Sequence, residues 1–133
     1  MSITLADQDA LTLRTAAWGA VSLMSAAGAA GSPHKAATEG SIALTSATGL
    51  VGHVLTKAPK GLNGKSVAEL ADQVLPALTA AVSLLKKQAP PEADNFRRTV
   101  IVAIEAAART HQGEPSPTMA EMIRKITGAL DAA

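Results

Sequence analysis

The sequence contains no cysteine and no tyrosine, and its only aromatic residues are Trp18 and Phe96. The absence of cysteine excludes disulfide bonds, thiolate metal sites and a cysteine nucleophile. An excess of charge of either sign is also missing: 12 Lys and Arg residues oppose 11 Asp and Glu residues, which gives a net charge of +1. A nucleic-acid-binding domain needs a basic face to displace counterions from phosphates. We therefore expect no nucleic-acid partner.

Alanine is the residue that the chain has in abundance, with 29 among 133 residues. Alanine favours helix, but each buried alanine removes little apolar surface from water. Stability must then come from the close approach of helices that carry small residues. A length of 133 residues and an apolar content of 47% fit one domain with a buried core. The alanine bias is associated with GC-rich coding genomes, so we expect a bacterial source.

Two long stretches lack any formal charge, Thr15–Pro33 and Gly40–Thr56. Their lengths approach the roughly 20 residues of a membrane span, but they consist mostly of Ala, Ser, Thr and Gly, which gain little from lipid. We interpret them as buried helices and expect no membrane segment. The start of the chain, Met1–Asp9, is acidic, whereas a signal peptide begins with a basic segment. These features predict a cytoplasmic protein.

The spacing of apolar residues predicts an all-α fold, a single-domain bundle of about five helices. Proline at the first helical position favours helix starts at Pro33 and Pro117, each preceded by serine. The pairs Ser32-Pro33 and Ser116-Pro117 lie 84 positions apart, which leaves open a degenerate duplication of a helix hairpin. The predicted helices cover residues 5–28, 33–57, 66–88, 91–111 and 117–131, within one domain of residues 1–133.

Glycine and proline add detail to this prediction. Gly40 begins an apolar stripe that continues with Leu44, Ala47 and Val51, and its small first and third residues let a neighbouring helix approach closely. Gly49 and Gly52 each weaken a helix by about 1 kcal/mol relative to alanine. The predicted helix over 33–57 could therefore be interrupted near them. Ser66 and Glu69 form a capping box ahead of the strongest apolar stripe. Pro76 lies on the opposite side of that helix and is expected to face solvent.

The segment before Ser66 resembles the end of a phosphate-binding loop, because Gly64, Lys65 and Ser66 match its last three positions. Pro59 replaces the first glycine of that motif, however, and the preceding residues are predicted to be helical rather than a buried strand. Nucleotide hydrolysis is therefore not expected. Two interpretations stay open: a turn in which Ser66 only caps the helix, and a weak anion-binding turn formed by Gly61, Gly64, Lys65 and Ser66.

No catalytic or metal-binding constellation is visible. The three histidines, His34, His53 and His111, occur in no H-x-x-x-H or E-x-x-H pattern, so no helix presents paired ligands. No Asp or Glu pair falls in an apolar pattern that would raise its pKa for acid–base work. We expect no cofactor, and the residues present favour a protein that is not an enzyme.

Charged residues of the fourth predicted helix are expected to be solvated. Arg97 and Arg98 follow Phe96, but two arginines on a near-neutral domain are more typical of a solvent-facing surface than of a nucleic-acid patch. Glu105 and Arg109 are four residues apart and predict an exposed ion pair.

A five-helix monomer can surround one uncharged helix on all sides, but hardly two. We therefore expect a homodimer, with Leu11, Trp18 and Val21 as the interface anchors. The leading functional prediction is a non-enzymatic helical interaction or scaffold module that associates with itself. The alternative is a helical protein that binds a small apolar ligand or an anion.

Overall fold

A computed structural model describes residues 6–27, 33–57, 66–109 and 117–133. Within these ranges the protein is all-helical and contains no strand, which confirms the predicted fold class. Six helices pack together, one more than expected. They are α1 (Asp7–Ala27), α2 (Pro33–Thr45), α3 (Gly49–Leu55), α4 (Val67–Gln88), α5 (Pro90–Ala108) and α6 (Pro117–Asp131).

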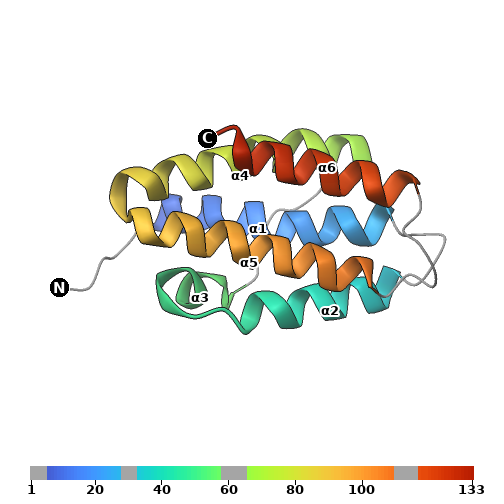
Figure 1. The fold of residues 1–133 in the computed structure, drawn as a ribbon, viewed down its shortest axis with the longest axis horizontal. Coiled ribbons are helices and arrows are strands. Elements are labelled where there is room, and N and C mark those ends of the chain that lie inside the picture. Colours follow the sequence, from blue (N-terminus) through green and yellow to red (C-terminus); the bar gives the residue numbers. More distant parts are fainter. Residues whose placement is uncertain (1–5, 28–32, 58–65, 110–116) are drawn as a thin grey trace.

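The five long helices lie along the long axis of the molecule (Figure 1). Helices α1 and α5 run in one direction, and α2, α4 and α6 run in the opposite direction. Helix α1 contacts each of the other five helices, and its most extensive contact is with α4. Helix α5 packs most extensively on α2. Helix α5 also contacts each of the other five helices, so α1 and α5 together form the centre of the structure.

The extra helix arises because the predicted segment 33–57 is broken between α2 and α3. Gly49 has a φ of +73°, in the left-handed region that side chains other than glycine rarely adopt. A Cβ at this position would also lie 2.6 Å from Oε1 of Glu92, so the Glu92 side chain would have to shift. The possibility of a break near Gly49 is confirmed, and the single helix over 33–57 is wrong.

Two glycines allow α1 to approach its neighbours closely. A Cβ at Gly19 of α1 would lie 2.3 Å from Cγ2 of Val74 in α4. A Cβ at Gly40 of α2 would lie 2.7 Å from Cγ1 of Val21 in α1. Both valines therefore occupy space that any larger residue at the glycine would need. The close packing through small residues predicted for Gly40 is confirmed.

Helix α4 begins as predicted. Ser66 is its N-cap, and the Ser66 hydroxyl oxygen accepts a hydrogen bond from the Glu69 N–H at 3.2 Å. Pro76 lies inside the helix and is exposed, in agreement with the prediction. The segment Ala68–Gln88 is long and apolar enough to cross a membrane by length and composition, and core helices of soluble proteins pass the same test. It coincides with neither of the uncharged stretches.

The two helix starts at Pro33 and Pro117 are confirmed, since α2 and α6 begin there. Their surroundings differ. Helix α2 packs on α1, the helix before it, whereas α6 has less contact with α5 than with α4. The duplication of a helix hairpin stays a prediction, and Ser32 and Ser116 lie outside the described residues.

Candidate functional site

The predicted anion-binding turn falls mostly outside the described residues, which exclude Gly61, Gly64 and Lys65. Ser66 is described, and its hydroxyl oxygen caps α4. This contact accounts for the serine without a ligand. Anion binding at the turn stays a prediction.

The three predicted interface anchors occupy three different environments. Leu11 is 44% exposed, as expected for an anchor. Trp18 is half-buried and packs against the core. Val21 is only 3% exposed and faces Gly40 of α2, so it is not available on the surface of a single chain, contrary to the expectation. The three residues therefore do not form one surface patch.

Trp18 has a structural task that the sequence did not suggest. Its indole N–H donates a hydrogen bond to the carbonyl oxygen of Leu55 at 3.2 Å. Nε of Arg14, one turn earlier, donates to the carbonyl oxygen of Val54 at 2.9 Å. The last carbonyl groups of a helix have no partner within the helix. Two side chains of α1 therefore satisfy the C-terminal end of α3.

The other end of α3 is held by α5. Oε1 of Glu92 accepts hydrogen bonds from the N–H groups of Leu50, at 2.5 Å, and Val51, at 3.4 Å. Nδ2 of Asn95 donates to Oε2 of Glu92 at 3.0 Å and to the carbonyl oxygen of Thr48 at 2.9 Å. The Thr48 side chain itself makes no capping bond, so a carboxylate from another helix takes over that task. Sequence analysis missed Glu92 because it lies more than forty residues from its partners.

The described interior offers little for acid–base or metal chemistry. Thr99 is the one buried polar residue of the described part, and its hydroxyl donates to the carbonyl oxygen of Asn95 at 2.7 Å. His53 is exposed on α3. No group of three or more His, Asp or Glu side chains within the described ranges could hold a metal ion.

An open hollow with a volume of about 380 Å³ lies between α1 and α4. Leu11 is its large apolar residue, and Ala77 and Ala80 of α4 leave the space beside it. The polar residues around it, among them Gln8 and Thr12, carry no charge.

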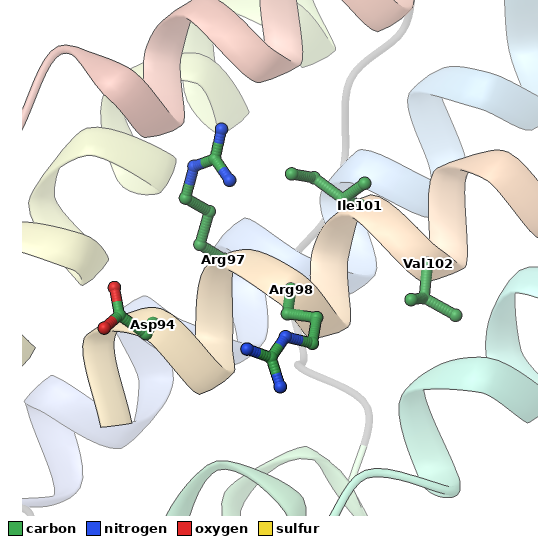
Figure 2. Close-up of a pocket in the computed structure, with 5 residues that line it drawn as sticks. All are labelled: Asp94, Arg97, Arg98, Ile101 and Val102. Atoms are coloured by element: carbon green, nitrogen blue, oxygen red, sulfur yellow. The ribbon is translucent and has the colours of Figure 1, made fainter. Parts of the chain in front are cut away.

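A second hollow, with a volume of about 300 Å³, lies on the outer side of α5. Figure 2 shows that Arg97 and Ile101 leave the helix on one side of it, and Arg98 and Val102 on the other. Val102 is 47% exposed, and Ile101 is half-buried. Exposed residues continue from this hollow toward both ends of α5. We call the following six residues the α5 outer stripe: Asp94, Arg98, Ile101, Val102, Glu105 and Arg109.

The charged residues near this hollow differ in whether they form ion pairs. Arg97, beside the stripe, forms an ion pair with Asp131 of α6 at 2.9 Å. By contrast, neither of the two ion pairs found among the described residues involves a charged member of the α5 outer stripe. The ion pair predicted between Glu105 and Arg109 is thus not formed. Arg98 is exposed, as expected.

No protein-family model, no curated protein and no solved structure matches this chain. Its function is therefore inferred from the chemistry of its own surfaces.

Proposed function

We propose that the chain is a non-enzymatic helical interaction module that associates with itself. The observation that carries the proposal is the α5 outer stripe, in which exposed Val102 and half-buried Ile101 lie between charged residues. Apolar side chains gain free energy when a partner removes them from water, about 25 cal/mol per Å². Charges that surround such a centre favour one partner and one orientation over others.

The character of the described interior also favours an interaction module over an enzyme. General acid–base catalysis needs ionisable groups whose pKa values are shifted by burial or by close neighbours. In the described ranges the one polar residue buried in the core is Thr99, which cannot serve as an acid or a base near neutral pH.

Sedimentation velocity over a wide range of protein concentration tests the proposal. We expect the weight-average mass to rise from that of one chain toward that of two chains. The surface involved is small, so the association should be weak and become visible in the range of about 10 µM to 1 mM. A mass equal to one chain at every concentration would contradict self-association.

The alternative function, binding of a small apolar ligand, has one observation in its favour. The hollow between α1 and α4 places Leu11 beside alanines, with hydroxyl and amide groups at its edge. A thermal-shift screen with small apolar compounds separates the two functions. A ligand present at 100 times its Kd adds about 2.7 kcal/mol to the free energy of unfolding. Substitution of Leu11 by Asp should abolish that shift if the ligand occupies this hollow.

A further inference from the structure

We propose that the partner of the α5 outer stripe is the same stripe on a second copy of the chain. The two α5 helices cross in antiparallel directions about a two-fold axis that passes between Ile101 and Val102. This inference rests on the proposed function and adds the surface, the orientation and the register of the contact.

The order of charges along the stripe leads to this register. In an antiparallel pair whose axis lies between positions 101 and 102, two residues from different copies lie at the same level when their numbers add to 101 + 102 = 203. Ile101 then meets Val102 of the second copy. Arg98 meets Glu105 of the second copy, since 98 + 105 = 203. The two-fold axis repeats each contact, so the apolar centre has an ion pair on either side.

The next charged positions obey the same rule. Asp94 and Arg109 also add to 203, and their charges are opposite. All four charged residues of the stripe are exposed, and they have no ion-pair partner in the described part of their own chain. In this register every charge of the stripe therefore lies at the level of an opposite charge of the second copy. A strongly acidic or basic partner would match only half of them.

Helix geometry allows the inner ion pairs to form. Arg98 lies 3.5 residues and Asp94 lies 7.5 residues from the axis, which is about 5 Å and 11 Å along the helix. Two helices that cross at about 50°, the commonest angle in globular proteins, have separated sideways by about 4 Å and 9 Å at these points. The Arg98–Glu105 contact is thus short enough for long side chains at this angle. The outer contact closes only if the helices cross at a smaller angle.

The hollow on α5 lies at the proposed axis. Arg97 and Ile101 form one i, i+4 ridge, and Arg98 and Val102 form the next, with the hollow between them (Figure 2). The two-fold axis passes through this hollow, so the Ile101 and Val102 side chains of both copies meet over it.

Charge exchange between positions 98 and 105 tests the register. Arg98→Glu places Glu opposite Glu105 of the second copy, and Glu105→Arg places Arg opposite Arg98. We expect each single variant to raise the dimer Kd at least about tenfold. The double variant Arg98→Glu/Glu105→Arg restores both contacts in reversed order, so its Kd should return to within about threefold of the unsubstituted protein.

Mixing the two single variants gives a sharper result. A heterodimer of Arg98→Glu with Glu105→Arg has opposite charges at both inner contacts, so the mixture should dimerise more tightly than either variant alone. Lys125→Glu and Asp72→Lys are the matched controls, because they change the net charge by the same amounts at exposed sites on α6 and α4. Their mixture should bind no more tightly than the unsubstituted protein. Far-ultraviolet circular dichroism verifies that each variant is folded.

Each outcome of sedimentation equilibrium decides between the proposals. The α5 contact is supported if each single variant dimerises more weakly and if the double variant and the mixture regain the dimer Kd of the unsubstituted protein. An unsubstituted protein that dimerises, with single variants that dimerise equally well, overturns the α5 contact and leaves self-association through another surface. Failure of the mixture, or control variants that alone are weakened as much as Arg98→Glu and Glu105→Arg, overturns the register. A monomer at every concentration overturns both the α5 contact and the proposed function.

Discussion

The contact between Gly19 and Val74 gives the sharpest test of how this protein is packed. In a helix, alanine is more favourable than glycine by about 0.8–1.0 kcal/mol. At position 19, however, the added Cβ would lie 2.3 Å from Cγ2 and 3.0 Å from Cγ1 of Val74. Val74 is fully buried, and a β-branched side chain in a helix has essentially one χ1 rotamer, so it cannot turn away.

Overpacking of a core costs about 1–3 kcal/mol. The overlap at position 19 belongs near the upper end of that range because the Val74 side chain cannot change its rotamer. After the gain in helix propensity is subtracted, Gly19→Ala should lower the free energy of unfolding by about 1–2 kcal/mol. Gly128 is the matched control, because it lies in α6 and a Cβ there would meet nothing within 4 Å. Gly128→Ala should therefore stabilise the protein by up to about 1 kcal/mol.

Urea denaturation followed by circular dichroism measures both variants, and the midpoint should move down for Gly19→Ala and up for Gly128→Ala. Val74→Ala removes two methyl groups and should alone cost about 2 kcal/mol. In the Gly19→Ala background the same change relieves the overlap, so its cost should fall by at least about 1 kcal/mol. If Gly19→Ala stabilises the protein as Gly128→Ala does, the close packing of α1 on α4 is refuted.

The remaining predictions concern the ends of helices. Gly49→Ala should destabilise the protein by about 1–3 kcal/mol, because position 49 has a φ of +73° and the Cβ would meet the Glu92 carboxylate; an unchanged urea midpoint would contradict this. Trp18→Phe keeps most of the ring but loses the hydrogen bond to the Leu55 carbonyl, so we expect a loss of about 1 kcal/mol and faster amide exchange confined to α3. Ser66→Ala removes the N-cap of α4 and should cost about 1 kcal/mol, whereas Ser66→Asp should restore it; equal stability of all three proteins would disprove the cap.

The features that the sequence predicted correctly are those with local causes. Ser66 and Glu69 are three residues apart, and the capping contact between them involves no other element. Gly40 was recognised as a site of close approach because its stripe contains small residues at helical spacing. In both cases the pattern that carries the information spans a few turns of one helix.

The features that the sequence did not reveal depend on contacts between distant segments. Trp18 is large and lies in an uncharged stretch of the chain, which made it a reasonable interface anchor, but its N–H is bound to a carbonyl 37 residues away. Val21 was assigned to the surface because the side on which α2 would lie was unknown. The polar contact of Glu92 with the start of α3 spans 42 residues. No pattern within one helix contains these partners.

The α5 outer stripe combines both kinds of information. Its charges could be read from the sequence, and they suggested a pair within one helix, Glu105 with Arg109. The structure shows instead that they have no ion-pair partner in the described part of the chain, while Arg97 beside them is paired with α6. The order of the charges acquires a meaning only when the outward side of α5 is known.

The two sides of α5 also separate folding from association. Phe96, Val100 and Ile104 of its inner side are buried in the core, so substitutions there change the free energy of unfolding. Val102 and the charged residues of the α5 outer stripe are exposed, and exposed substitutions usually change stability by less than about 0.5 kcal/mol. The exchange of charge at positions 98 and 105 therefore acts on the contact between copies and leaves the folded chain intact, which is the condition under which its result can be interpreted.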